Sequence, residues 1–134
     1  MCLIVSTKAK DKFLKRHKNK SKVIVWKVLN RPIQHNQPWT TLFRYVQIKK
    51  AGWFKAVGKL SKECVEEGVI HVYTTRQEAR KNIYTKDGVT PPLSKLLRCE
   101  ALLKDLIAVG EDNDACFSKI WIPKKEILSI GTVN

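Results

Sequence analysis

Apolar residues along this chain fall into short runs, most of which have the pattern of strands. Residues 2–5 form a short apolar run, and residues 23–29 and 69–74 are rich in β-branched and aromatic side chains. Polar or turn-forming residues follow each of the three ranges. In residues 41–48, aromatic and aliphatic side chains fall on opposite faces of a period of two. The pattern therefore predicts a strand over each of these four ranges.

The second half of the chain is less clear, because residues 93–109 are apolar enough for either a helix or strands. Position parity favours a strand from Leu97, and the choice for residues 97–109 stays open. The shared face would hold Leu97, Cys99, Ala101, Leu103, Ile107 and Val109. Residues 110–114 predict an acidic hairpin connection, and residues 116–122 predict a strand that Pro123 ends.

Two segments carry helix signals. Thr75 and Glu78 fit a capping box, which predicts a helix to about Tyr84. Ser61 as an N-cap and Gly68 as a stop predict a shorter helix. With the strands, these signals predict an α+β fold, in which an antiparallel-rich sheet carries about two short helices in a single layer. The length of 134 residues predicts one domain over residues 1–134.

The net charge of +14 is unevenly distributed along the chain. Residues 1–67 hold 16 Lys and Arg against 4 Asp and Glu, whereas residues 68–134 hold 10 against 8. The densest part, residues 8–22, predicts a basic loop or a frayed helix with Asp11 as its single acid. Such a charge block favours polyanionic partners, namely nucleic acid, a nucleoprotein complex or an acidic protein. A solvated mobile loop is the alternative.

A second basic segment, residues 49–54, contains a glycine and two aromatic side chains, and it predicts a turn that exposes Trp53 and Phe54. Exposed aromatic rings between lysines can stack on single-stranded bases. No recognition helix, zinc-finger spacing or RNP-type pattern is present, so we expect contacts to the backbone or to shape, with DNA versus RNA open. The predicted nucleic-acid-binding residues are Lys8, Lys10, Lys12, Lys15, Arg16, Lys18, Lys20, Lys22, Lys49, Lys50, Trp53 and Phe54.

Enzyme hypotheses rest on two weaker features, and no catalytic residue is assigned. Removal of Met1 would give Cys2 an amine as its own base, and this start resembles N-terminal-nucleophile hydrolases; a buried first-strand cysteine is the alternative. His71 and Tyr73 faintly resemble the arrangement of some ADP-ribosyltransferases; a half-buried histidine with a neighbouring partner is the alternative.

Cysteine and histidine spacing predicts neither a metal site nor a cofactor. The four cysteines are far apart, and His17 and His35 lack metal-ligand spacing. We therefore expect reduced thiols in a cytoplasmic protein. No apolar run approaches the roughly 20 residues of a membrane-spanning helix, so no membrane span is expected. The oligomeric state stays open.

Four parts of the chain resemble a group of small uncharacterised proteins carried by bacteriophages and prophages. They are the Met1-Cys2-Leu3-Ile4 start, the strand over residues 26–29, the strand with His71 that leads from Gly68 into a Thr-capped helix, and the late strand ending in Ile122-Pro123. The resemblance implies a phage accessory protein in the bacterial cytoplasm, where such proteins often inhibit host enzymes or defence complexes. The first hypothesis is a non-enzymatic basic protein that engages nucleic acid or a nucleoprotein complex. A protein-directed, anti-CRISPR-like inhibitor and a small enzyme are the alternatives.

Overall fold

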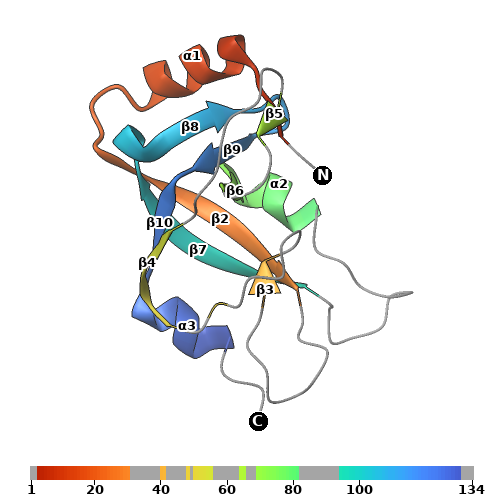
Figure 1. The fold of residues 1–134 in the computed structure, drawn as a ribbon, viewed down its shortest axis with the longest axis vertical. Helices are drawn as coiled ribbons and strands as arrows, with labels where there is room; N and C mark the ends of the chain where they lie inside the picture. The colour runs from red at the N-terminus through yellow and green to blue at the C-terminus, as the bar shows by residue number, and fades with distance from the viewer. Residues whose placement is uncertain are drawn as a thin grey trace.

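One antiparallel sheet of eight strands is the largest element of the described chain (Figure 1). The structure, a computed structural model, describes residues 3–30, 40–41, 48, 50–55, 64–65, 69–81 and 94–130. The elements are β1 (Leu3–Ile4), α1 (Thr7–Arg16), β2 (Lys22–Asn30), β3 (Thr40–Thr41), β4 (Gly52–Lys55), β5 (Cys64–Val65), β6 (Ile70–Tyr73), α2 (Arg76–Lys81), β7 (Ser94–Leu102), the 3-10 turn η2 (Leu103–Asp105), β8 (Leu106–Val109), β9 (Asp114–Phe117), β10 (Lys119–Ile122) and α3 (Lys124–Ile130). The predicted α+β class with an antiparallel sheet is confirmed.

The strands β2 and β7 form the longest pair, which runs from Lys22 opposite Leu102 to Asn30 opposite Ser94. Alternate residues of both strands are buried on one face, as the strand period requires. These inward residues are Val23, Val25, Leu29, Leu97, Cys99 and Ala101. The strand predicted around Val25 is confirmed, and the alternative of a helix from Leu97 onward is settled in favour of strand as far as Leu102.

The sheet curls, because strands that follow each other closely in sequence lie far apart in the strand order. That order is β4-β10-β7-β2-β6-β9-β8, with β3 beside the end of β2. Only Ser118 separates β9 from β10, and only η2 separates β7 from β8. Such short links require the two ends of the sheet to bend toward each other, as in a barrel. The Ser118 N–H donates to the Asp105 carbonyl at 3.0 Å. This hydrogen bond joins the link between β9 and β10 to the link between β7 and β8.

The main core lies against the concave side of this sheet. Phe117, Leu97 and Ile120 are fully buried there. Phe13 of α1 is buried in the same cluster, and Ile127 of α3 packs against it. α2 packs elsewhere, with Ala79, Val28 and Tyr73 in a separate cluster. The sheet thus carries α1 and α3 on the side of the main core.

Several local predictions are confirmed. β6 occupies the strand predicted over residues 69–74. α2 follows the capping residue Thr75, whose Oγ1 accepts from the Glu78 N–H at 3.2 Å. The hairpin between β8 and β9 is closed by the Gly110 N–H, which donates to the Asp114 carbonyl at 2.9 Å. These elements form as predicted because local sequence signals specify each of them.

Other predictions are wrong in ways that strand pairing explains. Cys64–Val65 is the strand β5 and not part of a helix, because it pairs with Leu3–Ile4 of β1. Gly52–Lys55 is the strand β4 and not a turn, because it pairs with β10. The single strand predicted over residues 116–122 is divided at Ser118, where the chain changes pairing partners. α3 was not predicted.

The predicted strand over residues 41–48 lies mostly outside the described residues; only Thr41, at the end of β3, and Ile48, which is buried, are described. No helix in the described part of the chain is long and apolar enough to cross a membrane.

Candidate nucleic-acid interface

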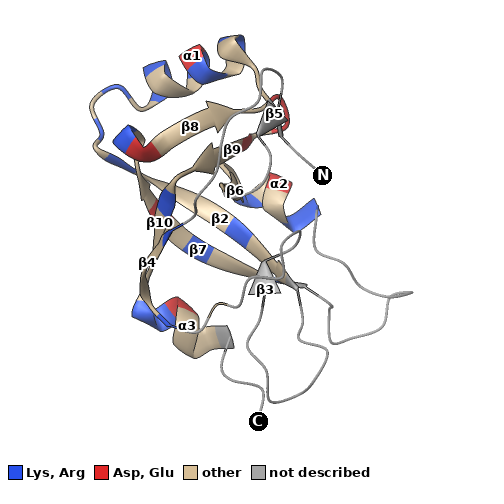
Figure 2. Ribbon diagram, viewed as in Figure 1, with Lys and Arg blue, Asp and Glu red and all other residues tan. Residues whose placement is uncertain are grey.

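The basic segment that begins at Lys8 forms a capped helix, α1. Ser6 is the N-cap, and its Oγ accepts from the Ala9 N–H at 3.1 Å. The helix ends at Arg16, where the His17 N–H donates to the Phe13 carbonyl at 3.1 Å. Phe13 is the buried residue that anchors the helix to the core, so the remaining surface of α1 is free to display its cations (Figure 2).

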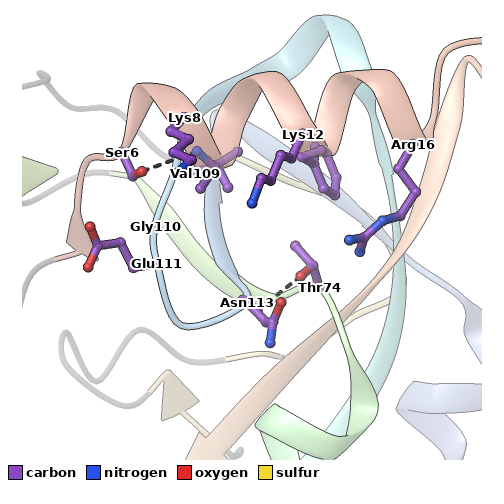
Figure 3. Close-up of a pocket in the computed structure, with 11 residues that line it drawn as sticks. Ser6, Lys8, Lys12, Arg16, Thr74, Val109, Gly110, Glu111 and Asn113 are labelled. Atoms are coloured by element: carbon purple, nitrogen blue, oxygen red, sulfur yellow. Dashed lines mark hydrogen bonds between the residues drawn. The ribbon is translucent and has the colours of Figure 1, made fainter.

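A groove of roughly 400 Å³ lies between α1 and the turn that follows β8. Lys8, Lys12 and Arg16 line it from the helix, because residues four apart share one face of an α-helix. Lys12 and Arg16 extend from α1 toward Thr74 and Asn113 (Figure 3). Within the described part of the chain, none of the three cations forms an ion pair.

The wall opposite α1 is fixed by hydrogen bonds around Asn113. The Thr74 N–H and Oγ1 both donate to the Asn113 carbonyl, at 2.8 and 3.0 Å. Asn113 has a φ of 53°, in the left-handed region that asparagine tolerates better than most residues. Glu111 is the one acid that lines the groove, and its carboxylate points away from Lys12 and Arg16 (Figure 3). Lys12 and Arg16 therefore face a polar wall without a carboxylate directed at them.

The other predicted cations lie elsewhere. Lys10, Lys15, Lys18 and Lys20 are on α1 and the turn after it, and none of them lines the groove. Lys22 begins β2, and its Nζ lies 2.9 Å from Glu100 Oε1. Lys50 is exposed, and Lys49 lies outside the described residues. The sequence alone thus identified the basic segment. The structure places its cations in the groove, on the outer surface of α1 and the turn after it, and, for Lys22, beside Glu100.

A pair of exposed tryptophans forms a second feature, on β4 and β10. Trp53 is 42% exposed and Trp121 38%, and their rings meet edge to face with centroids 5.3 Å apart. The Lys119 Nζ lies 4.5 Å from the centroid of the Trp53 ring. Phe54, predicted to be exposed, instead packs against the main core, because alternate residues of β4 face opposite sides.

Sequence reasoning missed Trp121. A usable signal was present, since Trp121 alternates with Ile120 and Ile122 and so takes the outward parity of its strand. Its pairing with Trp53 could not be anticipated, because the register of β10 on β4 is set by the whole sheet.

The residues of the enzyme hypotheses form no open site in the described structure. His71 Nε2 lies 3.0 Å from Asp114 Oδ2, and both side chains are largely buried, at 18% and 13% exposed. The Tyr73 ring meets the His71 ring edge to face at 5.1 Å. This arrangement supports the alternative of a half-buried histidine held by a neighbour. Cys2 lies outside the described residues.

The buried setting of His71 predicts an acid-sensitive stability. Burial lowers the pKa of His71, its hydrogen bond to Asp114 opposes that effect, and the charge of Lys27 adds to it. The unfolded chain therefore binds a proton at a higher pH than the folded protein, so stability is lost as pH falls below the unfolded value. We expect urea unfolding to show this loss between about pH 7 and pH 5.5, with a smaller loss in His71→Gln. Equal losses in the two proteins would contradict this role for His71.

Neither metal binding nor thiol chemistry finds support in the described residues. They contain no group of three His, Cys, Asp or Glu side chains placed to hold a metal ion. Cys99 and Cys116 are free and buried, and burial raises the pKa of each thiol to about 12. Both thiols are therefore protonated and unreactive at neutral pH.

Comparison of the chain with known protein families, curated proteins and solved structures finds no match. The resemblance to phage proteins accordingly stays a prediction. The groove beside α1, the tryptophan pair and the positive charge are the features of this protein that bear on its function.

Proposed function

We propose that this protein is a non-enzymatic nucleic-acid-binding protein that contacts phosphates with the groove beside α1. The observation that carries the proposal is the row formed by Lys8, Lys12 and Arg16, which lines an open groove and has no ion-pair partner among the described residues. Cations that neutralise phosphates release condensed counterions, and this release drives binding.

The spacing of the row suits a phosphate backbone. Four residues of α-helix rise by roughly 6 Å, so Lys8 and Arg16 lie roughly 12 Å apart along the helix axis. A nucleic-acid strand offers several phosphates over such a length. Thr74 and Asn113 add polar groups on the opposite wall. The net charge of +14 supplies long-range attraction to the same class of partner.

The bacterial cytoplasm of a phage-infected cell is the setting that the predicted resemblance suggests for this activity. A basic accessory protein could occupy nucleic acid held by a host complex without catalysing a reaction. A protein-directed inhibitor is the second hypothesis, and the experiment below separates the two.

The test is fluorescence anisotropy with labelled single-stranded DNA, RNA and duplex DNA over about 50 to 300 mM salt. We expect Lys8→Gln/Lys12→Gln/Arg16→Gln to weaken binding by about tenfold or more and to reduce the salt slope on duplex DNA by about 2 to 3. The matched control is Lys10→Gln/Lys15→Gln/Lys125→Gln, which removes the same charge outside the groove and should cost much less.

Two results would overturn the proposal. Equal losses in the two triple variants would show that only net charge matters and that the groove is not the site. Absence of nucleic-acid binding at physiological salt, with a stoichiometric protein complex that survives nuclease and high salt, would favour the protein-directed inhibitor, because electrostatic binding to nucleic acid collapses with salt.

A further inference from the structure

The outward face of β4, β10 and β7 carries a hollow of roughly 250 Å³ beside the two tryptophans. Trp121 lies directly opposite Trp53 on one side and opposite Glu100 on the other. Leu102 also lines the hollow. The perpendicular rings leave substantial aromatic surface open, which is unusual for the largest apolar side chains of a folded chain.

The charge around these rings is positive. Lys119 stands over the Trp53 ring, and it also lies directly opposite Lys55 across the β10–β4 pair. Like charges at directly opposite positions destabilise a strand pair. Neither lysine forms an ion pair with a described residue. An anion between the two lysines would relieve this repulsion. Glu100, the acid in the hollow, is already engaged by Lys22.

The tryptophan pair is also connected to the groove beside α1. The chain passes from Arg16 through the exposed Lys18 and Lys20 to Lys22, which lines the hollow beside Trp53. A flexible polyanion held in the groove would meet cations along this segment as well.

We propose that Trp53 and Trp121 form a stacking platform for unpaired bases, with Lys55 and Lys119 binding the flanking phosphates. The inference rests on the proposed function and defines its ligand class as single-stranded nucleic acid. Exposed aromatic rings beside a basic track are how proteins bind single strands without reading sequence. In a duplex the faces of the bases are covered by their neighbours, so the platform would add nothing there. Lysine is depleted at protein–protein interfaces, so the paired lysines favour nucleic acid as the occupant.

The experiment measures the affinity of platform variants for labelled strands of about 20 nucleotides, in single-stranded and duplex form. We expect Trp53→Leu/Trp121→Leu to bind single-stranded DNA and RNA at least about tenfold more weakly and duplex DNA within about twofold of the parent. Trp53→Phe/Trp121→Phe keeps a ring at each position and should stay within about threefold on every strand. Leu14→Ala/Leu128→Ala is the control, because these are the other exposed large apolar residues of the described chain.

The outcomes separate this inference from the proposed function. Unchanged single-strand binding by the leucine variant, or an equal loss on single strands and duplex, would overturn the stacking platform. Loss in the groove variants would still support the phosphate-binding role in that case. Absence of nucleic-acid binding by the parent would overturn both. An equal loss of single-strand binding in the leucine and phenylalanine variants would also overturn stacking, because the phenylalanine variant keeps an aromatic ring at both positions. Circular dichroism of each variant confirms that a loss of binding is not a loss of fold.

Discussion

Replacement of Phe117 by alanine is expected to lower the free energy of unfolding by about 3 to 5 kcal/mol. The side chain is completely buried in the main core. Its strand, β9, pairs on both sides, with Phe117 opposite Ile70 of β6 and Leu106 of β8. The next residue, Ser118, is the point at which the chain passes from β9 to β10. A cavity at this position therefore weakens the packing where the curled sheet is held together.

Urea unfolding followed by tryptophan fluorescence measures the effect. Leu128→Ala is the control, because Leu128 is 70% exposed on α3 and the change should stay within about 0.5 kcal/mol. A loss below about 1 kcal/mol for Phe117→Ala would contradict a close-packed core at this residue. The groove and the tryptophan pair lie on elements that this core supports. We therefore expect Phe117→Ala to bind nucleic acid normally under conditions in which it is folded, and to lose binding under conditions in which it unfolds.

The second large effect concerns Lys27, a lysine buried among apolar residues of β2. It is 6% exposed, and its Nζ donates to the His71 carbonyl at 2.6 Å. β2 and β6 pair only at Trp26 and Tyr73, so the ammonium reaches a carbonyl beyond the end of that short pairing. Burial lowers the pKa of Lys27 to about 8, and the thiols of Cys116 and Cys99 oppose this only in part.

The sign of the pH dependence follows from this lowered pKa. Between about pH 8 and pH 10.5 the unfolded chain holds a proton at Lys27 that the folded protein has released, so the contribution of Lys27 to stability rises with pH. One unit of pKa shift corresponds to about 1.4 kcal/mol. Over the whole range from about pH 8 to pH 10.5, Lys27 therefore raises the free energy of unfolding by about 3 kcal/mol. The buried thiols act in the opposite direction, because their raised pKa values make stability fall once the unfolded cysteines ionise.

A comparison of the parent with Lys27→Met isolates the lysine, since both proteins contain the same cysteines. Between pH 7 and pH 10.5 the parent gains stability from Lys27, and Lys27→Met does not. We therefore expect the free energy of unfolding of Lys27→Met, taken relative to that of the parent, to fall by about 3 kcal/mol over this pH range. Methionine matches the length of the apolar stem without a charge. A difference between the two proteins that does not change with pH would show that Lys27 titrates normally and is not buried as described.

Buried Lys27 also shows the limit of pattern reasoning. Its position has the inward parity of Val25 and Leu29, so the strand pattern places a lysine on the core face. The pattern alone cannot say whether the ammonium finds a partner there. The carbonyl of His71, far away in sequence, is supplied by tertiary structure.

The sequence by itself determined the elements whose signals are local. The β-branched run of β2, the strand β6 and the cap at Thr75 all depend on residues within a few positions of each other, and the structure confirms all three. The sequence also determined the α+β class, the uneven charge and the basic segment, because composition and periodicity are properties of the chain before it folds.

Only the tertiary structure decided which of these residues meet. It selected Lys8, Lys12 and Arg16 for the groove, placed Trp121 beside Trp53 and turned Phe54 into the core. It also divided one predicted strand at Ser118 and converted a predicted turn into β4. The physical reason is that contacts between distant residues depend on strand register and on the curl of the sheet. Both are set by the packing of the whole core, and no short stretch of sequence contains that information.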